Sequence, residues 1–146
     1  MALELQVLGL SVLLAMVQLL LFAVPANREV GTVWLAGPRD GEMPAPLSAR
    51  TARLQRAFQN HIEGLAFFTP AVVVVVLGGA SSGFTGAAAV VYLLARIAYL
   101  PCYWAGIPWL RSAVWGVAMG ATLAMLLAAL LGGPVAEAGG SAGAGG

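Results

Sequence analysis

Charged side chains are scarce in this chain of 146 residues. Aspartate, glutamate, lysine and arginine together make up 9% of the sequence, whereas hydrophobic residues make up 60% and the mean hydropathy is +0.90. Soluble domains carry about 25% charged residues. A chain with so few charges cannot cover a water-facing surface, which excludes an ordinary soluble domain and indicates an integral membrane protein.

Three further scarcities exclude classes of site. Cys102 is the only cysteine, so an intrachain disulfide and a cysteine-rich metal site are excluded. His61 is the only histidine, and without a second imidazole a metal site is disfavoured. The basic residues are all arginine and form no stripe on a soluble surface, which argues against nucleic-acid binding.

What the chain does have is a series of four apolar runs, each long enough to cross about 30 Å of hydrocarbon. We predict helices over residues 5–26, 49–79, 85–105 and 109–132, within a single transmembrane domain of residues 1–135. The predicted fold class is an all-α membrane protein, a bundle of four transmembrane helices. A flexible Gly/Ala tail is predicted over residues 136–146.

The first apolar run is interpreted as a membrane helix rather than a signal peptide, because it is longer than a normal h-region and the residues before it include Glu4 but no positive charge. Pro25 and Asn27 are predicted to end this helix. Glycine and proline punctuate the segment from Asn27 to Ser48 and disfavour regular structure there. This segment is either a connector at the membrane surface or a lid over a site, and Ser48 is a predicted N-cap for the second helix.

The distribution of arginine predicts how the helices are oriented. Five of the seven arginines lie between Arg28 and Arg56, around the first loop, and Arg111 follows the third loop. By the positive-inside rule, loops one and three are cytoplasmic and both termini lie outside. The start of the second helix, the end of the third and the start of the fourth then share one side of the membrane.

Polar residues gather at these three places. A spacing of three, four and three puts four side chains of the second helix within an arc of about 80°: Arg53, Arg56, Asn60 and Glu63. One face of the third helix holds Tyr92, Arg96, Tyr99 and Tyr103. The fourth helix opens with Arg111 and Ser112, and Trp115 follows one turn later.

Arg96 has two interpretations. A charge inside the bilayer is costly, so this side chain is not expected to face lipid. One possibility is a structural pair with Glu63 that locks the second and third helices together. The other is an anionic ligand, because one glutamate cannot neutralise several arginines and the arginine fork suits carboxylates.

Glutathione has the matching groups: two carboxylates, one ammonium and one thiol. If the thiol is used, a nearby cation favours the reactive thiolate. Arg111 is the best-placed candidate for that role, with Ser112 as a hydrogen-bond donor. His61 lies off the polar arc and is interpreted as an interface residue in preference to a general base.

Two segments resemble motifs of the MAPEG family, the membrane-associated proteins of eicosanoid and glutathione metabolism. RxxRAFQNHIEGLAFF resembles the family's helix-two signature RAxxNxxE, here Arg56, Ala57, Asn60 and Glu63. RIAYLPCYWAGIPWLRS resembles the arginine–tyrosine segment of helix three and the arginine–serine start of helix four. The sequence of the second segment is similar to that of bacterial members, which implies a bacterial inner (plasma) membrane.

The resemblance implies a homotrimer that binds glutathione as a co-substrate between adjacent subunits, near the cytoplasmic side. The residues carried over by position are Arg53, Arg56, Asn60, Glu63, Arg96, Tyr103, Arg111 and Ser112. Tyr99 joins this set from the third-helix face, and Arg111 matches the arginine assigned to thiol activation. Gly116 and Gly120 permit close packing of the fourth helix and would serve either the bundle or the trimer.

Two functions are compatible with these observations. The first is a glutathione-dependent transferase or peroxidase whose second substrate is a lipophilic electrophile from the bilayer. The second is a non-catalytic membrane protein of the same fold that binds an anionic or lipid ligand. A transporter is disfavoured, because the chain lacks an internal repeat and a discontinuous helix pair.

Overall fold

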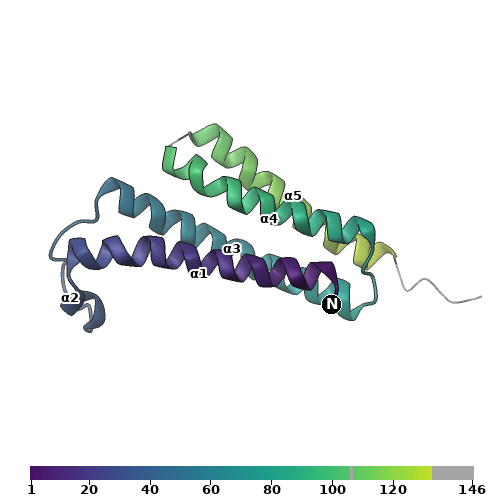
Figure 1. Ribbon diagram of the computed structural model, residues 1–146, viewed down its shortest axis with the longest axis horizontal. Helices are drawn as coiled ribbons and strands as arrows, with labels where there is room; N and C mark the ends of the chain where they lie inside the picture. The colour runs from purple at the N-terminus through teal and green to yellow at the C-terminus, as the bar shows by residue number, and fades with distance from the viewer. Residues whose placement is uncertain (106, 133–146) are drawn as a thin grey trace, which may run out of the picture.

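The structure is a computed structural model that describes residues 1–105 and 107–132 (Figure 1). Its elements are α1 (Leu3–Val30), α2 (Thr32–Ala36), α3 (Ala49–Leu77), α4 (Gly83–Ala105) and α5 (Pro108–Gly132). The four long helices are each long and apolar enough to cross a membrane. The predicted all-α fold of four spanning helices is confirmed, and the tail predicted over residues 136–146 lies outside the described residues.

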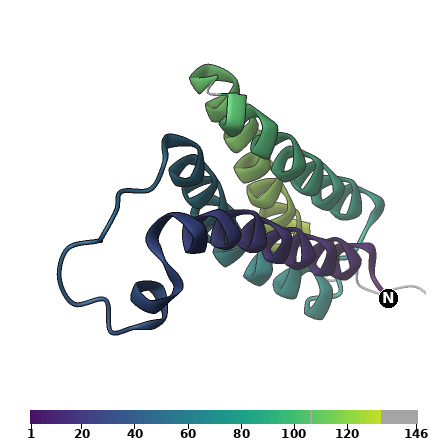
Figure 2. The same cartoon turned by 60° about the vertical axis from the view of Figure 1, so that its left-hand side comes forward.

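The helices form two antiparallel pairs. α1 lies beside α3 and α4 lies beside α5, and the pairs meet where α3 contacts α5 and α1 contacts α4 (Figure 1). Figures 1 and 2 show the pairs close together at the end that holds the N-terminus. They diverge toward the end where α3 begins and α4 finishes. The polar residues singled out in the sequence lie toward this divergent end.

The core lies where the two pairs meet. Phe68 and Val72 of α3, Tyr92 of α4 and Met125 of α5 are fully buried together. The rings of Phe68 and Tyr92 stack with their centroids 3.8 Å apart and their planes 5° from parallel. Lipid gives helices no hydrophobic reason to associate, so close packing of this kind stabilises the bundle. It also fixes how α3 and α4 are rotated, and hence which of their faces reach the site.

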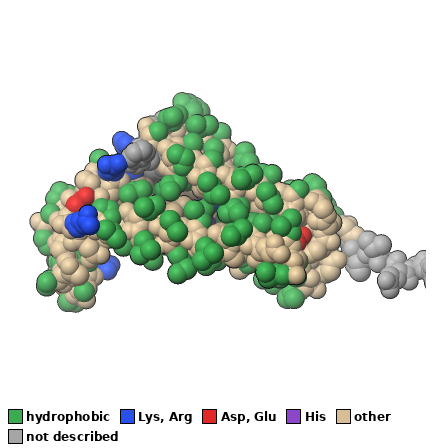
Figure 3. All heavy atoms as spheres, in the orientation of Figure 1, with side chains coloured by type: hydrophobic (Ala, Val, Ile, Leu, Met, Phe, Trp, Pro, Cys, Tyr) green, Lys and Arg blue, Asp and Glu red, His purple; other side chains and the backbone are tan. Residues whose placement is uncertain are grey.

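The outer surface is apolar over most of its length. Hydrophobic side chains spread along the flank of the bundle in Figure 3, and Leu13, Leu94 and Leu123 are each more than half exposed. Most of the arginine and acidic side chains visible in Figure 3 gather at the divergent end, which carries α2 and the start of α3. This distribution suits helices surrounded by hydrocarbon with one charged end in water.

α1 ends later than predicted, so the expected end at Pro25 and Asn27 is wrong. Pro25 removes one backbone donor, yet the helix continues to Val30. The Asn27 side chain donates to the carbonyl of Ala23 at 2.8 Å within the same stretch. Lipid strongly favours internal backbone hydrogen bonds, so a single proline does not end the helix. Gly31 ends it, with φ at +95°.

The segment predicted to lack regular structure contains the short helix α2 and is closed by Glu29. The Glu29 carboxylate accepts hydrogen bonds from the backbone N–H and the hydroxyl of Ser48, both at 2.8 Å. It also accepts one from the Thr51 hydroxyl at 2.6 Å. Ser48 is the N-cap of α3, as predicted, and its hydroxyl accepts from the Thr51 N–H. We call these contacts the Glu29 clasp; they join the end of α1 to the start of α3.

Two buried polar contacts tie α1 to the other long helices. At the convergent end, the Thr85 hydroxyl of α4 donates to Glu4 at 2.5 Å, and both side chains are buried. Farther along α1, the Gln18 side chain lies 3.1 Å from Nδ1 of His61 on α3, and this pair is also buried. Buried polar groups are costly unless they are paired, so these contacts specify how α1 sits in the bundle.

Candidate functional site

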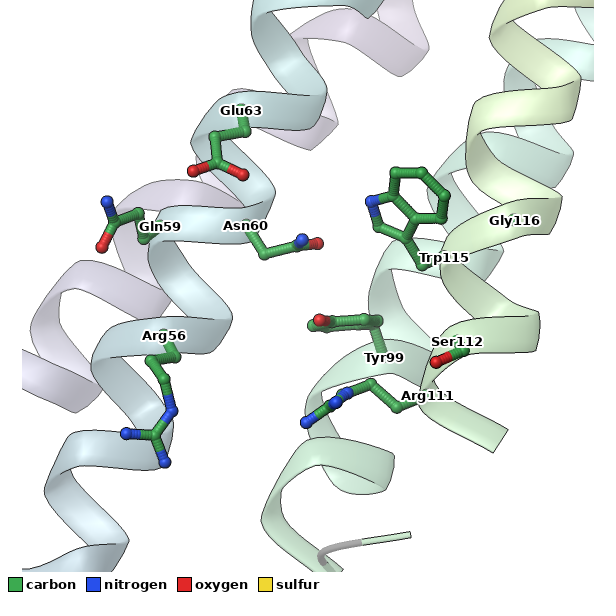
Figure 4. Close-up of a pocket in the computed structure, with 9 residues that line it drawn as sticks. All are labelled: Arg56, Gln59, Asn60, Glu63, Tyr99, Arg111, Ser112, Trp115 and Gly116. Carbon is green, nitrogen blue, oxygen red and sulfur yellow. The ribbon is translucent and has the colours of Figure 1, made fainter. Parts of the chain in front are cut away.

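A pocket of about 610 Å³ lies where the two helix pairs diverge. Its lining comes from α3, α4 and α5 of one chain (Figure 4). The lining residues are Arg56, Gln59, Asn60, Glu63, Tyr99, Arg111, Ser112, Trp115 and Gly116. The volume is within the range of about 300–1,000 Å³ that is typical of sites for small molecules.

α3 supplies a cation, an amide and an anion to the pocket. Arg56, Asn60 and Glu63 follow one another at helical spacing, and Ala57 and Gly64 on the neighbouring face are buried against the bundle. Figure 4 shows Asn60 reaching from α3 across the gap toward the opposite helices. The packing of α3 therefore leaves its polar face at the mouth of the divergence.

α4 and α5 supply the opposite wall. Tyr99 comes from α4 and is 5% exposed, whereas Ser112 and Trp115 of α5 are exposed. α5 begins at Pro108, so Arg111 and Ser112 stand in its first turns. The side chains of Tyr99, Arg111 and Trp115 extend toward α3 in Figure 4. The positive end of the helix dipole adds to the positive potential on this wall.

Comparison with known families agrees with this architecture. The model of the MAPEG family matches residues 7–131, nearly the whole chain. The chain belongs to the MAPEG family. Searches of curated proteins and of solved structures gave no match. Family membership and four apolar helices together make the chain a multi-pass integral membrane protein.

In this MAPEG protein, six of the nine site residues expected from the sequence line the pocket. They are Arg56, Asn60, Glu63, Tyr99, Arg111 and Ser112. The fold thus brings together residues that are up to 56 positions apart in the sequence. It does so because the starts of α3 and α5 and the later turns of α4 lie at the same end of the bundle. The pocket brings together both motif segments within one chain.

Arg53 and Tyr103 are placed differently from these six. Arg53 is exposed on α3, one turn before Arg56 and outside the pocket lining, where the helix pairs are farther apart. Tyr103 belongs to α4, but its side chain lies outside the described part of the chain. The role of Arg53 expected from its sequence position therefore has no counterpart in the lining of this pocket.

Arg96 lies behind the pocket rather than in its lining. The side chain is 1% exposed, and its Nη1 donates to Oδ1 of Asn60 at 2.8 Å. Among the described residues, Nε and Nη2 have no hydrogen-bond partner. The Tyr92 ring lies beside the guanidinium, 5.2 Å from Cζ to the ring centroid. The prediction that Arg96 forms a structural pair with Glu63 is therefore wrong, because Arg96 donates to the amide oxygen of Asn60 instead.

Three lining residues stand outside the expected site set. Trp115 and Gly116 follow Arg111 and Ser112 by one turn each, so the helical spacing of α5 is the signal that finds them. Gln59 precedes Asn60 at the edge of the predicted polar arc, and in Figure 4 its side chain turns away from α4 and α5. Trp115 offers a ring face to the pocket that is 44% exposed.

His61 points into the bundle and away from the pocket. Its side chain is 1% exposed and contacts Gln18 of α1. This contact agrees with the interpretation of His61 as an interface residue between helices. A general base must come within hydrogen-bond reach of the reacting group, and the pocket lining does not include His61.

Proposed function

We propose that this MAPEG protein is a glutathione-dependent transferase or peroxidase that acts on lipophilic electrophiles. The observation that carries the proposal is the pocket itself, which joins Arg56 and Glu63 of α3 to Arg111 and Ser112 of α5. Two arginines against one glutamate leave a surplus of one positive charge. Glutathione at neutral pH carries a surplus of one negative charge.

The recognition follows from the groups on the two walls. Arg56 and Arg111 present planar forks that bind carboxylates through paired hydrogen bonds. Glu63 suits the ammonium of the γ-glutamyl end, and the Tyr99 hydroxyl suits a peptide group. Because the lining presents cations on both walls and an anion on α3, a ligand must carry both signs of charge to pair with all of them.

Arg111 and Ser112 are the proposed catalytic residues. The guanidinium of Arg111 stabilises the thiolate of bound glutathione, and the Ser112 hydroxyl donates a hydrogen bond to the sulfur. In the transferase reaction, sulfur forms a bond to an electrophilic carbon, whose bonding electrons pass to the leaving group or to a conjugated acceptor that takes up a proton. In the peroxidase reaction, two glutathione thiols are oxidised to the disulfide while a hydroperoxide is reduced to an alcohol and water.

The second substrate reaches the site from the bilayer. Ile62 and Phe67 on α3 are 44% and 60% exposed and flank the pocket residues along the helix. They give an apolar molecule a hydrocarbon-like surface beside the polar pocket. With loops one and three in the cytoplasm of a bacterial inner membrane, glutathione arrives from the water side and the electrophile from lipid.

The active form is proposed to be a homotrimer with glutathione bound at the contacts between subunits. Gly116 and Gly120 of α5 support this, because a side chain at either position would meet no atom of another described element within 4 Å. This small-residue face is therefore not used for packing inside one bundle and is available for a second copy. Gly116 also lines the pocket, so a second copy packed on this face would come within reach of the bound ligand.

The test is glutathione binding by the purified full-length protein in detergent or nanodiscs, followed by ultraviolet difference absorbance of the thiolate. Binding with a thiolate signal, and turnover of a lipophilic electrophile or hydroperoxide, supports the enzyme. Binding without a thiolate signal would favour the non-catalytic protein of the same fold. Failure to bind glutathione at millimolar concentration would overturn the proposal.

A further inference from the structure

Arg96 is linked to the pocket lining through Asn60. Its Nη1 donates to Oδ1 of Asn60 at 2.8 Å, while its own side chain is 1% exposed. Asn60 is half-buried and lines the pocket. A buried cation on α4 is thereby connected to a polar group that a ligand can touch.

Gly64 makes this contact possible. It lies one turn after Asn60 on α3, and a side chain added at this position would overlap Nη2 and Cζ of Arg96. The guanidinium therefore fills the space that a Cβ atom would take. Any larger residue at this position would force Arg96 to move away from α3.

The chemistry of the pair fixes the orientation of the Asn60 amide. A guanidinium has only donors, so the atom that faces it must be the amide oxygen. The amide nitrogen is then directed away from Arg96. In Figure 4, Asn60 extends toward Tyr99 and Trp115 on the opposite wall. The charged partner also polarises the amide and strengthens the N–H groups as donors.

We infer that Arg96, packed against Gly64, is a positioning residue. It orients Asn60 so that the amide N–H groups of Asn60 donate hydrogen bonds in the pocket. The part of the ligand bound at Asn60 is then a hydrogen-bond acceptor, a carboxylate or a peptide carbonyl oxygen. This inference rests on the proposed function for the identity of the ligand. The orientation of Asn60 is a property of the protein alone and can be tested without glutathione.

The first test uses the scarcity of asparagine. Asn27 and Asn60 are the only asparagines in the chain, so labelling with ¹⁵N-asparagine gives two side-chain amide groups in an NMR spectrum. Gly64→Ala displaces Arg96 and should shift the Asn60 amide signals while those of Asn27 stay in place. Gly9→Ala on α1 is the matched control, because a Cβ there meets no other described atom within 4 Å. Unchanged Asn60 signals in folded Gly64→Ala protein would overturn the inference.

The second test does not depend on whether Gly64→Ala folds. Asn60→Asp keeps an oxygen for Arg96 but presents only acceptors to the pocket. Gln59→Glu adds the same charge one residue away in the lining and controls for simple repulsion of an anion. We expect Asn60→Asp to weaken glutathione binding at least about tenfold more than Gln59→Glu, at unchanged or higher thermal stability.

The outcomes separate the inference from the proposed function. Equal losses of affinity in Asn60→Asp and Gln59→Glu would overturn the positioning role of Arg96. They would not contradict the proposal that the unaltered protein binds glutathione. Absence of binding by the unaltered protein would overturn the proposed function, while the amide signals still decide whether Arg96 orients Asn60. A role for Arg96 in stability alone predicts that Asn60→Asp binds glutathione no worse than Gln59→Glu.

Discussion

The two ends of the bundle each bury an ionisable side chain against a neutral partner, with different consequences. At the convergent end, Glu4 accepts a hydrogen bond from Thr85, and both are enclosed by packed helices. At the divergent end, Arg96 donates to Asn60, which opens onto a pocket. A buried polar contact closed in by helices stabilises one arrangement of the bundle. The same kind of contact next to a pocket can shape what binds there.

The largest effect that would test this comparison is expected from Arg111→Ala at the divergent end. Loss of the cation beside the thiol should lower kcat/KM by about 100-fold or more, because electrostatic stabilisation of a developing charge carries much of such catalysis. The thermal stability should change little. The measurement is steady-state turnover together with the thiolate absorbance. Arg39→Ala is the control, since Arg39 donates to the Leu35 carbonyl and lies outside the pocket lining. Retained turnover in Arg111→Ala would remove this residue from the mechanism.

A smaller effect on binding is expected from Arg56→Ala, by comparison with Arg53→Ala one turn earlier on the same helix. Loss of a charge-assisted hydrogen bond in the pocket should raise the Kd for glutathione about tenfold or more. Arg53→Ala should raise it less than about threefold, because Arg53 lies outside the lining. Calorimetric titration of both variants measures the difference. Equal losses would mean that the ligand extends beyond the pocket toward the start of α3.

The convergent end should respond in stability alone. Thr85→Val removes the hydroxyl that donates to Glu4 and should cost about 1–3 kcal/mol, because a buried acceptor is left unpaired. Glutathione affinity should stay within about twofold, since the change lies at the other end of the bundle. Thr69→Val is an isosteric control at an exposed position of α3. Thermal unfolding in detergent and the Kd are the two readouts, and a large loss of affinity in Thr85→Val would show that the two ends are coupled.

The four spanning helices were predictable because hydrophobic length is decisive in a membrane. The hydropathy and length of α1 and α5 are those of membrane-spanning helices, and Ser48 marks the start of α3 by its capping chemistry. The end of α1 was predicted wrongly because proline ends helices in water more readily than in lipid. α2 was not predicted because five residues are too few to give a periodic signal.

The spacing along α3 predicted which of its residues share a face, and Arg56, Asn60 and Glu63 do line one pocket. The position of Arg96 could not be predicted in the same way. Its place inside the bundle depends on Gly64, a residue on another helix, and on the stacking that fixes the rotation of α4. Such contacts between helices leave no periodic trace in a single sequence.

The Glu29 clasp has a practical consequence for labelling this protein. Because Ser48 and Thr51 are bonded to Glu29, the two helix ends are held together independently of the path between them. A peptide tag inserted beside Gly41, whose φ is +99° in the exposed part of that path, lengthens a loop that is already tied at its base. An accessible tag there would report on which side of the membrane the loop lies in intact cells, with the helices and the pocket left undisturbed.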